Sequence, residues 1–202
     1  MMKQYQLLKE KLSSLALMAL VLLLYPTMTS AQQKIEREYA IKATQVPKPA
    51  LQFVGKVFET QRIRWYAEES QKGRSIEAKV KADGTIYSIE FDQEGKLQDI
   101  EVLVKFQSLS EDLRKAIKKT LEAEFTRTKI LKVQKQWTGP ASTLQLLVGK
   151  KEPLEKYTTK YELVIRGSKD KGTSDYEVLV NEQGKLISKS KIIQKDSPHL
   201  LF

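Results

Sequence analysis

The stretch FDQEGKLQDIEVLV, residues 91–104, decides the fold because the chain repeats it in altered form as VNEQGKLISKSKII, residues 180–193. Gly95 aligns with Gly184 at an offset of 89 residues. In both copies a turn containing glycine precedes alternating apolar side chains, which is typical of a β-hairpin. Each glycine stands where the turn is expected to need a positive φ, which glycine adopts at the lowest cost. The echo therefore predicts a repeated unit that ends in the same hairpin.

The first unit reads outward from this hairpin as one helix followed by about four strands. Residues 47–58 begin with prolines and carry apolar side chains at helical spacing, which favours an amphipathic helix. Residues 63–70 are expected to form a strand, and residues 76–81 alternate apolar and charged side chains as a half-buried strand does. The Asp83-Gly84 pair then predicts a tight hairpin turn into the next strand.

The same order returns in the second unit. Ser108 and Glu111 have the spacing of a capping box at the start of the clearest amphipathic helix in the sequence. The apolar residues of this helix are Leu109, Leu113, Ile117, Leu121 and Phe125. Further strands are expected around residues 131–137, 161–165 and 176–180, where apolar side chains alternate with polar ones.

We therefore predict an α+β fold of two tandem repeats, residues 46–106 and 107–193, each a helix packed on an antiparallel meander of about four strands. The second repeat contains an insert, residues 138–157, that the first repeat lacks. The insert carries an apolar run between glycine and proline breakers. This pattern favours either an extra hairpin that caps the sheet edge or a loop that contacts a partner.

Both ends of the chain lie outside these repeats. Residues 1–31 combine basic residues, an apolar core too short to span a bilayer and small residues before Gln32, which indicates a cleaved secretory signal peptide. Residues 32–45 are polar and are interpreted as a leader, and residues 194–202 as a tail. We expect a periplasmic or secreted protein with no transmembrane anchor after cleavage.

The composition limits the possible partners. The chain has no cysteine, and its formal net charge of +10 favours anionic partners such as acidic proteins or charged glycans. Because basic and acidic residues alternate, as at Lys79, Lys81 and Asp83, the charge is also typical of solvated sheet faces. Nucleic acid is not expected as a partner.

These features together resemble the PepSY-like exported proteins of Bacteroidetes, whose fold is related to that of the β-lactamase-inhibitor proteins. In the first half the matching residues are Val46 to Phe58, Trp65, Ile76-Glu77-Ala78, Phe91-Asp92 and Gly95-Lys96. In the second half they are Leu109 to Phe125, Trp137, Tyr161-Glu162, Tyr176-Glu177-Val178 and Gly184-Lys185. The second half departs from the pattern at the insert. The resemblance implies a non-enzymatic exported module that binds, and in some relatives restrains, another protein.

Catalytic chemistry has little support in the sequence. The single histidine, His199, lies near the C-terminal end, a poor setting for a general base. The chain has no cysteine nucleophile, no G-x-S-x-G motif and no glycine-rich phosphate loop. A zinc site needs three or four suitable ligands, and this chain offers one histidine besides its acids. We expect no enzyme activity, no cofactor and no metal.

Tyr66 is the first candidate contact with a partner. It follows Trp65 on an expected strand, so the two side chains should point to opposite faces. Trp65 and Trp137 are expected to fill the space between helix and sheet, which leaves Tyr66 as an aromatic anchor of the kind that interfaces favour.

The insert supplies the other candidate contacts. Leu146 and Leu147 lie in its apolar run, and Lys150 and Lys151 follow directly. If the leucines are exposed, apolar groups rimmed by cations form a plausible anchor patch. If they are packed inside, the insert is a cap.

Two functions from different classes remain open at this stage. The first is an exported, non-catalytic protein-binding module, for which inhibition of an envelope or secreted enzyme is one conceivable role. The alternative is a cell-envelope module that binds anionic glycolipid or polysaccharide through a basic sheet face. Salt separates them, because diffuse charge pairing is screened at about 0.5 M salt and shape-based binding is not.

Overall fold

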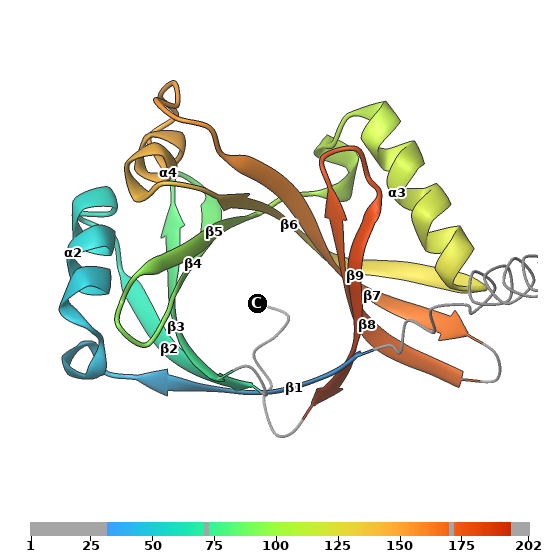
Figure 1. Ribbon diagram of the computed structural model, residues 1–202, viewed down its shortest axis with the longest axis horizontal. Helices are drawn as coiled ribbons and strands as arrows, with labels where there is room; N and C mark the ends of the chain where they lie inside the picture. The colour runs from blue at the N-terminus through green and yellow to red at the C-terminus, as the bar shows by residue number, and fades with distance from the viewer. Residues whose placement is uncertain (1–31, 71–72, 170–171, 195–202) are drawn as a thin grey trace, which may run out of the picture. The chain divides into compact units, whose positions relative to one another are not determined.

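Nine strands form one closed sheet in the computed structural model, which describes residues 32–70, 73–169 and 172–194 (Figure 1). Consecutive strands pair antiparallel, whereas the first and last strands pair parallel and close the sheet. The expected signal peptide and all but the first residue of the expected tail lie outside the described residues.

The strands are β1 (Gln32–Ile41), β2 (Ile63–Ser70), β3 (Gly73–Ala82), β4 (Thr85–Phe91), β5 (Leu97–Leu103), β6 (Arg127–Thr138), β7 (Thr158–Lys169), β8 (Gly172–Asn181) and β9 (Leu186–Gln194). The α-helices of the described residues are α2 (Lys48–Val57), α3 (Glu111–Glu124) and α4 (Ala141–Val148). Short 3-10 turns, η1 (Ala43–Gln45) and η2 (Phe106–Ser108), precede α2 and α3.

The α+β fold predicted from the sequence is confirmed, with one helix before each run of four strands. Helix α2 precedes β2 to β5, and α3 precedes β6 to β9. The polar stretch at residues 32–45, interpreted as a leader, differs from expectation because residues 32–41 form β1. This strand pairs with both β2 and β9. It is formed through pairing with residues distant in sequence, which the pattern of its own residues does not predict.

Helices α2 and α3 each cover their own group of strands on the outside of the sheet (Figure 1). The first core contains Ala50 and Val54 of α2, packed with side chains of β2 to β5 such as Ile89. The second contains Ile117 of α3 with side chains of β6 to β8 such as Leu163. These four-strand groups each have one apolar face, and burying it under a helix drives the packing.

The two echoed turns have the same hydrogen bonds. In the first, the Asp92 carboxylate accepts from the backbone N–H groups of Glu94 and Lys96 at 3.1 and 2.8 Å. In the second, the Asn181 side-chain oxygen accepts from Gln183 and Lys185 at 3.0 and 2.9 Å. An aspartate and an asparagine thus make the same local turn, because each offers one oxygen two residues before the bend.

The two turn glycines also meet their helices in the same way. Gly95 has a φ of 84° and Gly184 a φ of 74°. A Cβ at Gly95 would lie 2.8 Å from the Pro47 Cβ, and one at Gly184 would lie 2.8 Å from the Ala116 Cβ. Each position therefore requires glycine both for its backbone conformation and for the close approach of a helix.

The start of α3 lies at a different serine from the one expected. Ser110 is the N-cap, and its Oγ accepts from the Leu113 N–H at 3.4 Å. Ser108, which the capping-box pattern favoured, belongs to η2 and donates to the Lys105 carbonyl oxygen at 2.7 Å. The short 3-10 turn moves the helix start, and Glu111 becomes the first helical residue.

The insert forms a helix rather than an extra hairpin. Helix α4 begins after Pro140, a favourable residue at a helix entry, and ends at Val148, with Gly149 as its C-cap. Its Leu144 is fully buried in the first core, although the insert belongs to the second group of strands. A fully buried leucine stabilises packing by about 1.5–3 kcal/mol, which is enough to fix so short a helix in place.

Candidate binding surfaces

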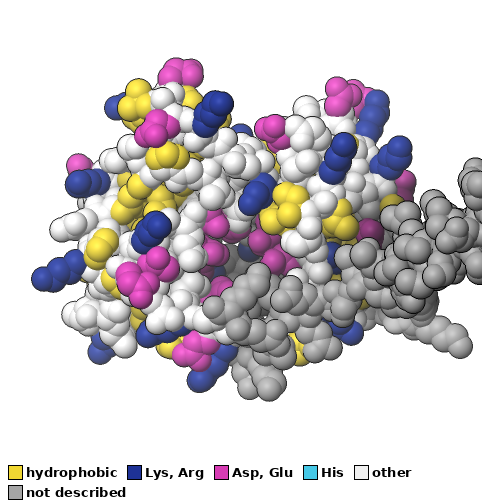
Figure 2. Space-filling view, viewed as in Figure 1, with side chains coloured by type: hydrophobic (Ala, Val, Ile, Leu, Met, Phe, Trp, Pro, Cys, Tyr) yellow, Lys and Arg dark blue, Asp and Glu magenta, His cyan; other side chains and the backbone are white. Residues whose placement is uncertain are grey.

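Acidic side chains line the inner face of the sheet, opposite the helices. Core residues alternate with inward-facing ones along each strand, and Glu77, Glu90 and Asp99 are direct neighbours on β3, β4 and β5. Figure 2 shows acidic side chains gathered around the hollow between the two helix-covered sides. Like charges placed directly opposite destabilise a strand pair, so this row costs stability when ionised.

Burial changes the protonation of this inner row. Burial and the neighbouring Asp99 raise the pKa of Glu90 well above its ordinary value. Burial, followed by the charge of Glu162, likewise raises the pKa of Glu101. The Glu101 carboxyl accepts a hydrogen bond from the Gln134 amide at 2.6 Å. The inner face is thus a hydrogen-bonded polar layer in which two glutamates retain protons more readily than free side chains do.

Lys79 forms ion pairs with two glutamates at one end of this polar layer. Its Nζ lies 2.8 Å from Glu38 Oε1 and 3.1 Å from Glu77 Oε2, and 4.8 Å from the centre of the Tyr66 ring. Burial lowers the pKa of Lys79, but the charge of Glu77 and the bonds to Glu38 outweigh it, so the net direction is upward. Burial raises the pKa of Glu77, and Lys79 opposes that effect. The ammonium group is therefore fixed and remains charged.

Tyr66 lies on this inner face. Trp65 is buried in the first core, and Tyr66, one residue further on, is the cross-strand partner of Glu77. The alternation expected for these two side chains is therefore present. Tyr66 is half-buried rather than fully exposed, and its role in partner binding stays a prediction.

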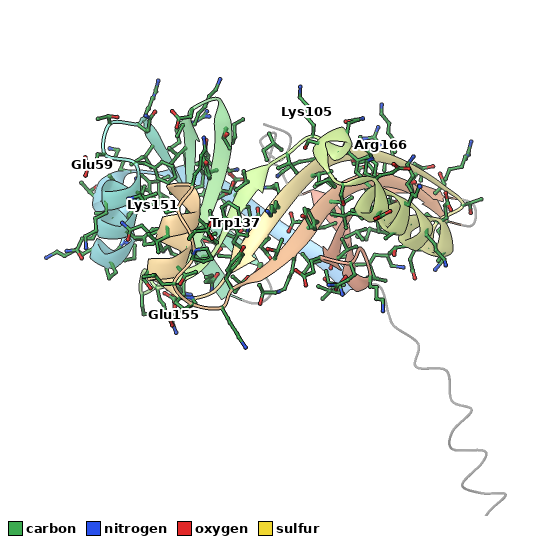
Figure 3. The ribbon with its side chains drawn as sticks, turned by 90° about the horizontal axis from the view of Figure 1, so that it is seen from above. Glu59, Lys105, Trp137, Lys151, Glu155 and Arg166 are labelled. Carbon is green, nitrogen blue, oxygen red and sulfur yellow. The ribbon has the colours of Figure 1, made fainter. Side chains whose placement is uncertain are left out.

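A second surface, the α2–α4 groove, lies on the outside of the sheet, between the end of α2 and the insert. It has a volume of about 620 Å³. Its lining residues of apolar type are Val57, Phe58, Ala82, Tyr87, Leu146, Val148 and Leu154. Its charged lining residues are Lys56, Glu59, Asp83 and Lys151. Glu59 and Lys151 come from the segments that follow α2 and α4, respectively (Figure 3).

The insert residues named from the sequence divide between this groove and the core. Leu146 and Lys151 line the groove. Leu147 is half-buried against the first core, and Lys150 is exposed with a φ of 55°. The structure does not bring Tyr66 and the insert together, because Tyr66 faces inward and α4 covers the outer face. Tyr66 and the insert residues therefore belong to two separate surfaces.

Two features of these surfaces were missed at the level of sequence. Leu154 is 78% exposed at the groove. The sequence could have indicated this exposure, because Leu154 is an isolated apolar residue in a polar stretch. The inward carboxyl row was visible as acids at every second position, at Asp99 and Glu101 for example. Only the closure of the sheet shows that this polar face is enclosed.

Trp137 differs from the place expected for it. It lies near the end of β6, opposite Ile100 of β5, and packs against the first core rather than the second (Figure 3). Lys135 Nζ lies 5.3 Å from the centre of its ring. Strand β6 therefore joins the two groups of strands, and its tryptophan belongs to the neighbouring core.

The described residues contain no group of three or more His, Cys, Asp or Glu side chains placed to hold a metal ion. None of the helices in the described ranges combines the length and the apolar character that crossing a membrane requires. The absence of enzyme activity and of a cofactor stays a prediction.

Comparisons with known proteins give a structural likeness. No protein-family model matches the chain, and no curated protein matches it in sequence. It is similar to a DUF2874 family protein from Bacteroides ovatus, with 15% identity, a TM-score of 0.46, and coverage of 72% of this chain and 87% of that one. It is also similar to a BLIP-like protein from Bacteroides fragilis, with 15% identity, a TM-score of 0.47, and coverage of 77% and 93%. The predicted resemblance is confirmed as structural similarity to Bacteroides proteins of these two kinds.

Proposed function

We propose that this chain is an exported, non-catalytic module that binds a partner protein, an envelope or secreted enzyme, through the α2–α4 groove. The observation that carries the proposal is the exposed Leu154 in a groove whose lining also includes the apolar side chains of Phe58 and Leu146. An apolar centre within a charged rim is the anatomy of protein interfaces. Burial of Leu154 by a partner would contribute about 1.5–3 kcal/mol.

The charges of the rim favour a protein segment over a polyanion. Lys56 and Lys151 are balanced by Glu59 and Asp83. A polyanionic glycan would gain no net attraction at such a rim, whereas a protein segment can place both signs of charge around one apolar side chain. The occupant that fits is therefore an apolar side chain of a partner protein with acidic and basic neighbours.

A duplication within the chain accounts for the presence of the groove on only one of the two groups of strands. We infer that residues 46–106 and 107–193 are copies of one unit, because their turns share hydrogen bonds and their glycines meet the helices alike. The α4 insert is the main departure of the second copy from the first. It supplies one wall of the groove, and a surface gained by only one copy is a natural place for a specialised contact.

The test uses a double variant that removes the apolar contacts and leaves the core intact. Leu146→Ser with Leu154→Ser should abolish capture of the envelope partner, as measured by pull-down from an envelope fraction at low salt and at about 0.5 M salt. The matched control is Leu186→Ser with Ile187→Ser, which changes two exposed apolar residues of β9. Equal capture by wild type and the groove variant, with unchanged thermal unfolding, would refute the groove. Loss of capture with the control variant alone would do the same.

A further inference from the structure

Four basic side chains converge on a hollow at the start of β2, which we call the rim hollow. It has a volume of about 400 Å³ and is lined by Gln61, Arg62, Arg64, Lys79 and Lys81. Arg64 and Lys79 are direct cross-strand partners on β2 and β3. Because Lys79 is paired with Glu38 and Glu77, the charge of this strand pair that a bound anion would offset is that of Arg64.

Three of these cations are available to a ligand. Arg62, Arg64 and Lys81 are exposed, and none of them forms an ion pair with a carboxylate in the part of the chain that the structure describes. They differ in this from Lys79, whose two carboxylate partners hold it in place. The rim hollow thus combines one fixed ammonium with three cations whose charge is not neutralised by a neighbouring acid.

The identity of the cations points to the class of ligand. A guanidinium group donates two parallel hydrogen bonds to a phosphate or sulfate, and an ammonium group adds a point charge. Two arginines and two lysines around one hollow therefore match a tetrahedral oxyanion. A carboxylate has only two oxygens and would leave part of this donor set without acceptors.

We propose that the rim hollow is an anion subsite that binds a phosphate or sulfate group, either free or as an ester. It is a different surface from the α2–α4 groove, although Gln61 lines both. The subsite lies where the basic end of β2 and β3 meets the acidic inner layer. The fixed Lys79 belongs to both, because it is paired with Glu38 and Glu77 and so reduces their repulsion of an anion.

The first experiment measures binding of inorganic phosphate to the full-length protein by calorimetry and by amide shifts in nuclear magnetic resonance. Arg62→Gln with Arg64→Gln should raise Kd by at least about tenfold, because each guanidinium contributes charge-assisted hydrogen bonds. Lys118→Gln with Lys119→Gln is the matched control, since it removes the same charge from exposed positions on α3. It should leave Kd within about twofold, as expected for a screened distant charge.

Further arms separate charge from geometry and identify the source of the anion. Arg64→Lys keeps the charge and loses the planar donor pair, so it should weaken binding less than the double variant does. A sulfated disaccharide and phosphatidylglycerol vesicles, each against its uncharged counterpart, test whether the group is carried by a glycan or by a lipid. Binding of any of the three probes that the arginine variant weakens and the control does not supports the subsite.

Two results would overturn the subsite. One is an equal change in Kd for the arginine and lysine double variants, which would indicate nonspecific charge. The other is no measurable binding of any of the three probes to the folded wild-type protein. Leu146→Ser with Leu154→Ser should leave phosphate binding unchanged, so failure of the groove and failure of the subsite remain distinguishable.

Discussion

The two helix-covered groups of strands share a turn and a helix contact, yet they build unequal cores. Among the described residues, the first core has 15 buried members and the second has 9. The difference includes Leu144, which the insert in the second group contributes to the first. Half-buried Trp137 of β6 packs on the same side. The first group of strands therefore depends on side chains that belong to the second.

The largest expected effects test whether α4 belongs to the first core. Ile117→Ala and Leu144→Ala each remove a fully buried aliphatic side chain, and each should lower the free energy of unfolding by about 2–5 kcal/mol. Denaturant unfolding measures both losses. Hydrogen exchange should show faster opening of β2 to β5 in Leu144→Ala than in Ile117→Ala. Faster opening of β6 to β9 in both variants would show that the insert stabilises its own group of strands instead.

Next in size are the turn glycines, which test whether the two units are built alike. Gly95→Ala and Gly184→Ala should each cost about 2–4 kcal/mol, because both strain the positive φ and press a methyl group against a helix. Gly84→Ala is the control, since its φ is 75° and nothing lies within 4 Å of the added Cβ. It should cost only about 1–2 kcal/mol. Unequal losses at the two echoed turns would break the correspondence between the units.

The acidic inner layer predicts a dependence of stability on pH. The folded-state pKa of Glu90 is raised above its ordinary 4.5, so its favourable contribution is complete below that value and is lost as pH rises toward the folded pKa. Glu90→Gln should therefore raise Tm at about pH 8 by about 2–4 °C for each kcal/mol recovered. It should have a smaller effect at about pH 4, which lies below the ordinary pKa and further below the raised one, so that the native carboxyl holds its proton.

Thermal unfolding of Glu90→Gln at both pH values checks this prediction. Glu122→Gln, at an exposed position on α3, is the matched control. A rise in Tm of the same size in the control, or an effect of Glu90→Gln that does not depend on pH, would contradict the account of the inner layer.

The smallest effect concerns the starts of the two helices. Helix α2 begins after Pro47 without a side-chain cap, whereas α3 has Ser110. Ser110→Ala should lower the free energy of unfolding by about 1 kcal/mol. Ser108→Ala, which removes the serine favoured by the sequence pattern, should cost less, because its hydroxyl does not bond to the helix. A larger loss of stability in Ser108→Ala than in Ser110→Ala would instead support the capping box predicted from the sequence.

The sequence predicts best what local interactions determine. The turns at Gly95 and Gly184 and the helix around Ile117 follow from turn chemistry and periodicity over a few residues. The 32–41 strand does not, because its partners lie 24 residues or more away in sequence, from Trp65 opposite Ile41 to Ser190 opposite Gln32. Helix α4 was missed because a short apolar run between breakers has no period that separates helix from strand.

The candidate surfaces show the same limit. Alternation predicted that Tyr66 and Trp65 face opposite sides, since that is a property of a single strand. It could not predict that Tyr66 shares an enclosed face with Glu77, because enclosure depends on strands from both ends of the chain. Nor could it separate Leu146, in the groove, from Leu147, against the core, because helix orientation depends on what α4 packs against.

The parallel pair that closes the sheet has a mechanical consequence. Gln32 of β1 pairs with Ser190, and Glu36 pairs with Gln194 of β9, so the first residue of β1 and the last of β9 lie at opposite ends of the pair. Tension applied through these two residues would act along the strands, and it would load the hydrogen bonds between them together instead of opening them one at a time. The β1–β9 pair is thus loaded in shear, the direction in which paired strands resist force best. We expect this domain to resist extension from its two ends better than a hairpin of equal length does.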